Sequence, residues 1–143
     1  MDGYKSILVA IDGSKNADKA FNEAVNIAVQ NQASLYIAAI INEEELSTSS
    51  FAYSKILKEE QEKTEVDMLK RIHDAKEAGL SQVEPIVEVG DPKVFITKTI
   101  PEAHMIDLII VGATGMGSIT REKVGSTTQY IVDNSPCSVL MVK

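Results

Sequence analysis

The sequence has a single cysteine, Cys137, and only two histidines, His73 and His104, among its 143 residues. One cysteine cannot close an internal disulfide, and these residues do not have the spacing of a cysteine and histidine metal site. Neither histidine has a cysteine or aspartate nearby at the spacing that nucleophilic catalysis uses. These absences exclude a disulfide-stapled fold and a zinc-type centre, and no residue stands out as catalytic.

Positive charge and long apolar runs are also scarce. The chain has 14 basic and 21 acidic residues, which gives a formal net charge of −7. Such a chain repels duplex phosphate overall, although backbone amides can still bind a phosphate group locally. No apolar run approaches the roughly 18 residues of a membrane span, and residues 1–5 contain no apolar signal core. We therefore expect a cytoplasmic protein with no nucleic acid and no membrane as partner.

The remaining composition is that of an ordinary globular protein, with 44% hydrophobic and 24% charged residues. The length is close to the commonest size of one domain, about 100–150 residues. No linker rich in proline, glycine and serine divides the middle of the chain. The sequence therefore predicts a single domain over residues 1–143.

Hydrophobic periodicity predicts strands that alternate with helices. The strand segments are nearly continuous apolar runs, typical of strands buried on both faces of a parallel sheet. We predict strands at 5–11, 35–41, 83–89, 106–111 and 138–142. We predict helices at 15–31, 52–78 and 127–134, and a further helix that begins at residue 91. This alternation predicts an α/β fold with a doubly wound parallel sheet and helices on both faces. Periodicity alone does not determine the order of the strands.

Several local features of the helices can be predicted in the same way. Asp91 and Pro92 form a strong helix start, and Pro101 should stop or kink that helix. Residues 126–129 have the form of a capping box. The spacing of apolar residues predicts a buried stripe on the long helix at Val66, Leu69, Ile72 and Ala75, and core positions after Pro92 at Val94, Phe95 and Thr99.

A glycine pattern follows the fourth strand directly. Gly112, Gly115, Gly125 and Ser126 have the spacing G-x2-G-x9-G-S. Glycines can adopt positive φ and let a ligand approach the backbone closely, and the start of the last helix would add free amides. Together with the Ser126 and Thr127 hydroxyls, these groups suit a phosphate or ribose-phosphate. This is neither a Walker loop nor the dinucleotide fingerprint.

The alternative is that these glycines only shape the connection between strand and helix. The loop over residues 112–125 is much longer than the usual connection of about two to six residues, which favours a ligand. Asp12, at the carboxyl end of the first strand, also lies where doubly wound sheets place functional groups. It is a candidate for a ribose hydroxyl or a nucleotide-bound metal ion, or else it is only a turn residue.

With these segments in place, the sequence resembles the universal stress protein family along essentially its whole length. Four marks carry the resemblance: residues 7–14, residues 107–112, the glycine pattern, and residues 135–142. The resemblance implies the strand order 3-2-1-4-5. It would make the first and fourth strands neighbours and bring Asp12 close to the glycine loop.

The complete glycine pattern resembles that of the family members that bind ATP. The resemblance implies an adenine-nucleotide cofactor, ATP with Mg²⁺ or Mn²⁺, and a regulatory or sensing homodimer paired through strand 138–142. The binding residues implied for this chain are Asp12, Ile40, Gly112, Gly115, Gly125, Ser126 and Thr127. Of these, Asp12 would contact ribose or the phosphate-bound metal, and Ile40 would line the adenine pocket.

Two other functions remain open at this point. One is a slow ATPase or nucleotide hydrolase, which the absence of a recognisable catalytic arrangement disfavours. The other is a stress-linked protein-interaction module in which the glycine loop is only structural. Turnover above a buffer blank would identify the first, and a lack of bound or titratable nucleotide would identify the second.

Overall fold

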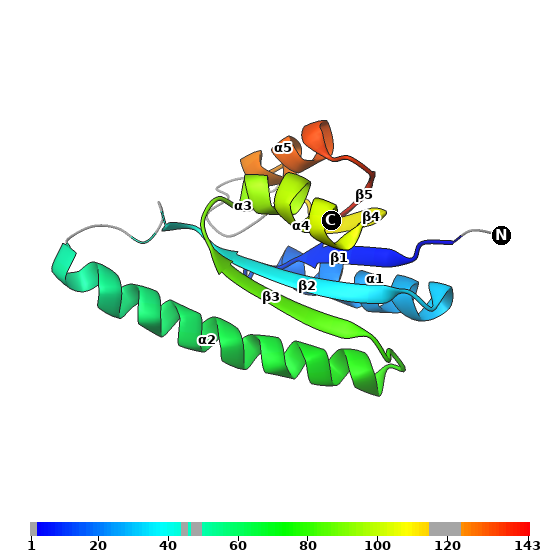
Figure 1. Cartoon of the computed structure of the whole chain (residues 1–143), viewed down its shortest axis with the longest axis horizontal. Helices are drawn as coiled ribbons and strands as arrows, with labels where there is room; N and C mark the ends of the chain where they lie inside the picture. Colours follow the sequence, from blue (N-terminus) through cyan, green and yellow to red (C-terminus); the bar gives the residue numbers. More distant parts are fainter. Residues whose placement is uncertain (1–2, 44–45, 47–49, 115–123) are drawn as a thin grey trace.

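The computed structural model describes residues 3–43, 46, 50–114 and 124–143. Within them the chain forms a five-stranded parallel sheet in the order β3-β2-β1-β4-β5 (Figure 1). The strands are β1 (Ser6–Ala10), β2 (Ser34–Ile41), β3 (Val83–Val89), β4 (Leu108–Gly112) and β5 (Ser138–Val142). The helices are α1 (Lys15–Asn31), α2 (Ser50–Glu77), α3 (Pro92–Val94), the π-helical η2 (Phe95–Thr99), α4 (Ile100–His104) and α5 (Ser126–Asn134). The predicted fold class and strand order are confirmed.

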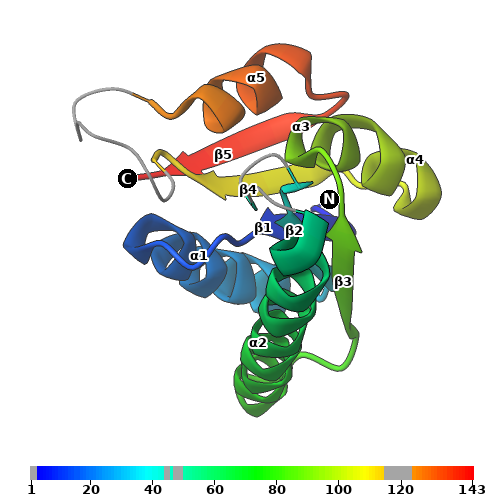
Figure 2. The ribbon, with the colours of Figure 1, turned by 90° about the vertical axis from the view of Figure 1, so that its left-hand side faces the viewer.

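The sheet is covered on both faces by helices (Figure 2). Helices α1 and α2 pack on one face, where Phe21 and Met68 join the buried core. The segment from α3 to α4 and helix α5 cover the other face through Ile96, Ile100 and Ile131. Because both faces are covered, successive residues of a central strand can all be apolar, which is why the strands read as continuous apolar runs.

Helix α2 turns a different face to the core than its sequence predicts. Val66 is 69% exposed and Leu69 is 68% exposed, so the predicted stripe is wrong for these two residues. Met68 and Arg71 are buried in their place, whereas Ala75 is buried as predicted and Ile72 is half-buried. The predicted stripe is the more apolar of the two, and the inward face includes Arg71, which is paired with Asp67 on the same helix and with Asp18 on α1.

The segment after β3 also departs from the prediction. Asp91 caps the helix as expected, since its side chain accepts a hydrogen bond from the Lys93 amide. Pro101 does not end the helix, because the wider π turn of η2 precedes it and Pro101 then lies in the first turn of α4. The wider turn changes which side chains face the sheet. The predicted core positions Val94 and Thr99 are exposed, and the buried residues are Ile96, Thr97 and Ile100.

The two edges of the sheet carry different residues. The edge strand β3 has Pro85 and the exposed Glu84 and Glu88, which discourage pairing with another strand. The other edge, β5, is apolar from Val139 to Val142. None of the helices in the described ranges is both long enough and apolar enough to cross a membrane.

Candidate functional site

A cleft with a volume of about 1020 Å³ opens at the carboxyl ends of the strands. This is where doubly wound sheets place their ligands, beside the point at which the strand order reverses. The volume is at the upper end of the range for small-molecule pockets. Six of the seven predicted site residues line the cleft, namely Asp12, Ile40, Gly112, Gly125, Ser126 and Thr127. Gly115, the seventh, lies outside the described residues.

The sheet order explains how distant segments meet there. Strand β1 pairs with β2 on one side and with β4 on the other. Asp12 follows β1, Ile40 is near the end of β2, and Gly112 ends β4. Because parallel strands end on the same side of the sheet, residues far apart in the sequence converge on one cleft.

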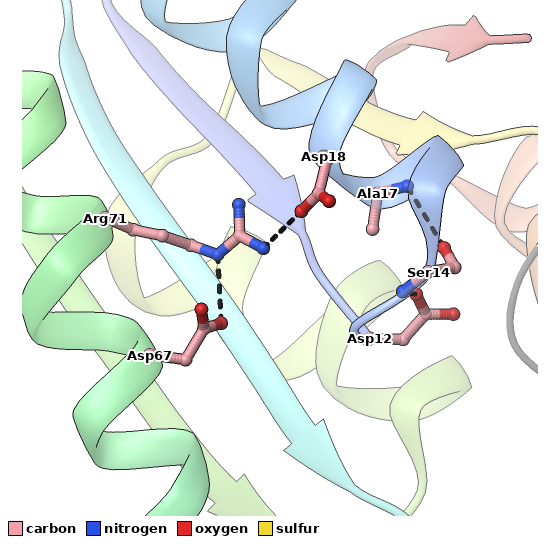
Figure 3. Close-up of polar contacts among 6 residues, drawn as sticks. All are labelled: Asp12, Ser14, Ala17, Asp18, Asp67 and Arg71. Atoms are coloured by element: carbon pink, nitrogen blue, oxygen red, sulfur yellow. Dashed lines mark hydrogen bonds and ion pairs between the residues drawn. The ribbon is translucent and has the colours of Figure 1, made fainter.

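Asp12 lies in a tight turn between β1 and α1. Its Oδ1 accepts a hydrogen bond from the Ser14 amide at 3.0 Å, and Ser14 in turn caps α1 by accepting from the Ala17 amide at 3.1 Å (Figure 3). Gly13 between them has φ of 84°, a conformation that favours glycine. The turn holds the exposed Asp12 carboxylate at the cleft, so it has both a structural role and a place in the site.

Gly112 is needed for packing, and not for the positive φ that the sequence suggested. It belongs to β4 and does not adopt positive φ. A Cβ at this position would lie 2.9 Å from the carbonyl carbon of Asn16 and 2.9 Å from its Cβ. The end of β4 can therefore touch the first turn of α1 only with glycine at 112.

The start of α5 forms one wall of the cleft. Its N-cap is Gly125 with no side-chain cap, so the predicted capping box at 126–129 is wrong. The Gly125 amide donates to Ala113 O at 2.9 Å, and Thr128 Oγ1 donates to Gly112 O at 2.7 Å. These bonds tie the helix start to the end of β4.

The first amides of a helix have no acceptor inside it, and the positive end of the helix dipole lies there. The Ser126 and Thr127 amides are such groups, and both residues line the cleft. We call the surface made by Gly112, Thr114, Gly125, Ser126 and Thr127 the amide wall. Its hydrogen-bonding side chains are hydroxyls, so it suits an anionic group.

An apolar surface lies beside the amide wall, on the face of the sheet that α3 and α5 cover. Ile40 packs with the core of that face and lines the cleft. It is joined there by Ala10, Ala38, Pro92, Ile96 and Ile131. The small side chains of the two alanines leave room above the strands, and a planar apolar group such as a nucleobase could rest on such a surface.

The opposite side of the cleft is charged, and the sequence analysis did not identify it. We call Asp18, Glu60, Lys63, Asp67 and Arg71 the charged wall, since all five line the cleft from α1 and α2. Its centre is Arg71, which is 8% exposed. The i, i+4 spacing of Asp67 and Arg71 was the available signal in the sequence.

Arg71 joins the two helices of this wall. Its Nη2 lies 2.6 Å from Asp18 Oδ1 and its Nε lies 3.0 Å from Asp67 Oδ2 (Figure 3). The guanidinium also lies 5.0 Å from the centre of the Phe21 ring. Burial by itself lowers the pKa of Arg71, but the hydrogen bonds and charges of Asp18 and Asp67 outweigh it and raise the pKa. Arg71 is thus neutralised by carboxylates of its own chain.

Cys137 does not contribute to this site. It lies just before β5, packs with the core under α5, and does not line the cleft. Burial raises the pKa of its thiol, and this effect is larger than that of a hydrogen bond with Ser135, which lowers the pKa. A thiol with a raised pKa is a poor nucleophile at neutral pH, which agrees with a structural role.

Comparison with known proteins gives one consistent result. Residues 3–143 match the model of the universal stress protein family. A Staphylococcus haemolyticus relative that bears the name of a universal stress protein is 38% identical over 141 residues, which cover 98% of this chain and 85% of the relative.

Solved structures agree with this result. The universal stress protein UspA from Lactobacillus plantarum superimposes with a TM-score of 0.91 at 33% identity, covering 100% of both chains. A universal stress protein solved in complex with cAMP superimposes with a TM-score of 0.67 at 25% identity, covering 99% of this chain and 98% of the other.

Proposed function

Because this chain belongs to the universal stress protein family, we propose that it binds an adenine nucleotide, ATP in the first instance, in the cleft at the carboxyl ends of its strands. One observation carries the proposal. Six residues chosen from the sequence, in four separate segments, line a single cleft beside the N-terminus of α5. A related structure in complex with cAMP adds support, since cAMP is also an adenine nucleotide.

The residues of the cleft divide naturally among the parts of a nucleotide. The amide wall supplies donors for the phosphates, and the apolar surface around Ile40 suits the adenine ring. Asp12 is the candidate for a ribose hydroxyl or for Mg²⁺ or Mn²⁺ that arrives with the phosphates, because such ions prefer carboxylate and phosphate oxygens. Arg71 is not needed for the phosphates, since it is already paired with Asp18 and Asp67.

The direct test is to denature the purified protein and identify any released nucleotide by mass spectrometry, followed by thermal unfolding with Mg-ATP. At a ligand concentration 100-fold above Kd, binding adds about 2.7 kcal/mol of stability. For a domain of this size we expect a rise in Tm of about 5–10 °C. An unchanged melting curve in saturating Mg-ATP would overturn the proposal. An equal shift with GTP would overturn only the preference for adenine.

The same samples test the alternative of slow hydrolysis. Chromatography of the nucleotide after long incubation would reveal ADP above a buffer blank if the protein is an ATPase. We expect the nucleotide to remain intact, because Asp18 and Asp67 are each held by Arg71 and the described cleft offers no histidine or cysteine. The expected role is therefore that of a cytoplasmic nucleotide-responsive regulator.

We also propose that two copies pair through β5 to form a homodimer. Strand β5 is at the edge of the sheet, and its apolar residues from Val139 to Val142 are only half-buried. An edge of this kind is protected if the same strand of a second chain pairs with it across a two-fold axis. Sedimentation at micromolar concentration should give twice the 15.5 kDa of one chain. A single species near 15.5 kDa would overturn the dimer.

A further inference from the structure

Thr114 lies at the cleft and directly follows Ala113, whose backbone is held by hydrogen bonds on two sides. The Ala113 amide donates to Val142 O at 2.7 Å, and Ala113 O accepts from the Gly125 amide at 2.9 Å. Ala113 is itself buried. Because both polar groups of Ala113 are engaged, the position from which the Thr114 side chain projects is well defined. Thr114 is half-buried and lines the cleft.

Asn16 stands behind Thr114, in the first turn of α1. Its side-chain Nδ2 donates a hydrogen bond to Thr114 Oγ1. The backbone of Asn16 also abuts Gly112, where a Cβ would lie 2.9 Å away. Thr114 lines the cleft, whereas Asn16 supports it from the side of α1.

A threonine hydroxyl has one proton to donate and two lone pairs to accept with. When Thr114 Oγ1 accepts from Asn16, one lone pair is used and the proton remains for a different partner. The neighbouring groups of the amide wall, such as the Ser126 and Thr127 amides, are donors, so the partner that completes the set is an acceptor.

We propose that Thr114 is a ligand-contacting residue whose hydroxyl donates to an anionic phosphate oxygen, and that Asn16 is the positioning residue that orients this hydroxyl. The inference rests on the proposed nucleotide binding. It adds one ligand contact and one supporting residue to the glycine pattern, which specifies neither of them.

The substitution Asn16→Asp tests the direction of this hydrogen bond. A carboxylate has nearly the same shape as the amide but only accepts, so the Thr114 hydroxyl must donate to it and turn a lone pair toward the ligand. A charge-assisted contact is then lost, and we expect the Kd for Mg-ATP to rise about 10- to 100-fold. The fold should not suffer, because an acidic residue in the first turn of a helix is favourable. Melting temperature without ligand is the readout for that control.

The effect of the added charge is separated from the effect of the hydroxyl by a double-mutant cycle. Thr114→Val removes the hydroxyl at nearly constant shape and should weaken binding to a similar degree, whereas Thr114→Ser should restore it. With valine at 114, Asn16→Asp should cause little further loss, because there is no hydroxyl left to reorient. Asn22→Asp, an exposed site on the same helix, should change Kd by less than about threefold.

Calorimetric titration with Mg-ATP and with inorganic triphosphate gives the outcomes. Loss of affinity for both probes in Asn16→Asp, absent in the valine background, supports the proposal. Wild-type binding with unchanged affinity in Thr114→Val overturns this inference alone. If Asn16→Asp causes the same loss of affinity when residue 114 is valine, the inference is also overturned, since the added negative charge then explains the loss. A wild-type protein that binds neither probe overturns both this inference and the proposed function.

Discussion

The two walls of the cleft face the same space but are built in opposite ways. The amide wall consists of backbone groups and hydroxyls at the end of β4 and the start of α5, and its first-turn amides have no acceptor within the helix. The charged wall consists of long side chains on α1 and α2, and its central residue Arg71 is already paired with Asp18 and Asp67. Arg71 and its two carboxylate partners are therefore less available to a ligand than the amide wall is.

The difference separates binding from stability. A donor without a partner gains most when an anion arrives, and such contacts are worth about 1.5–3 kcal/mol. An ion pair that is already formed contributes mainly to holding its two helices together. Changes in the amide wall should therefore weaken ligand binding, and changes in the charged wall should weaken the fold. Four substitutions test this division.

The largest effect is expected behind the charged wall, at Met68. This residue is 2% exposed and fixes the face that α2 turns to the sheet, one turn before Arg71. Met68→Ala should lower the free energy of unfolding by about 2–4 kcal/mol, because a buried side chain is removed and a cavity remains. Leu69→Ala, at a neighbouring residue that is 68% exposed, is the matched control and should change it by less than about 0.5 kcal/mol. Urea denaturation would measure both changes in the free energy of unfolding. If the two changes are equal, then α2 does not turn Met68 rather than Leu69 toward the sheet.

The next effect is expected in the amide wall, at Ser126. It is the first residue of α5, where proline is tolerated, and the extended conformation of Gly125, with φ −62° and ψ 152°, suits a residue before proline. Ser126→Pro removes one amide donor and should raise the Kd for Mg-ATP about 10- to 100-fold. Stability without ligand should stay within about 0.5 kcal/mol.

Ser126→Ala serves as the control for this change, because it removes the hydroxyl and keeps the amide. If titration calorimetry gives the proline and alanine variants the same affinity, the backbone amide is not the group that binds.

A smaller effect is expected at Arg71, and it concerns the stability of the fold and not the binding of the ligand. Arg71→Met keeps much of the side-chain volume but removes both ion pairs, whose carboxylate side chains are 59% and 45% exposed and can be rehydrated. We expect a loss of about 1–2 kcal/mol in the free energy of unfolding, below the usual cost of breaking a fully buried pair. The Kd for Mg-ATP should change less than about threefold. A large loss of affinity at unchanged stability would reverse the roles assigned to the two walls.

The smallest effect is expected at Asp67. Its contact with Arg71 spans one helical turn and its side chain is 45% exposed, so Asp67→Asn should cost less than about 1 kcal/mol. The pair His73 and Glu77 on the same helix, with side chains 71% and 72% exposed, provides a reference in Glu77→Gln, which should cost less. Thermal unfolding at low and high salt would measure both. If Asp67→Asn lowers the free energy of unfolding as much as Arg71→Met does, then the pair of Asp67 and Arg71 alone accounts for the stability that the charged wall provides.

The sequence predicted those features that depend on local pattern. The apolar runs correctly gave the five strands, and Asp91 followed by Pro92 correctly gave a helix start. The glycine pattern and Asp12 identified one side of the cleft before the structure placed them together. The order of the strands came from the family resemblance, since periodicity carries no information about which strands are neighbours.

The predictions that failed concern features that local pattern does not decide. Val66 and Leu69 have a helical spacing as good as that of Met68 and Arg71, and Arg71 can be buried because Asp18 on another helix and Asp67 on its own helix both pair with it. After Asp91, the π turn of η2 brings Ile96 and Ile100 to the sheet in place of Val94 and Thr99. The sequence analysis noted that Gly112 can adopt positive φ, but its actual constraint is the approach of Asn16 from α1.

The sequence by itself therefore determined the elements of this protein, its parallel sheet and the glycine-rich side of its cleft, because apolar period, helix caps and glycine spacing act over a few neighbouring residues. Tertiary structure decided which face of α2 is buried, how Arg71 is paired, and how Asn16 supports Thr114. Asp18 and Arg71, like Asn16 and Thr114, lie far apart in the chain. A contact between residues so distant forms only when the sheet brings their elements together, and it leaves no periodic trace in the sequence.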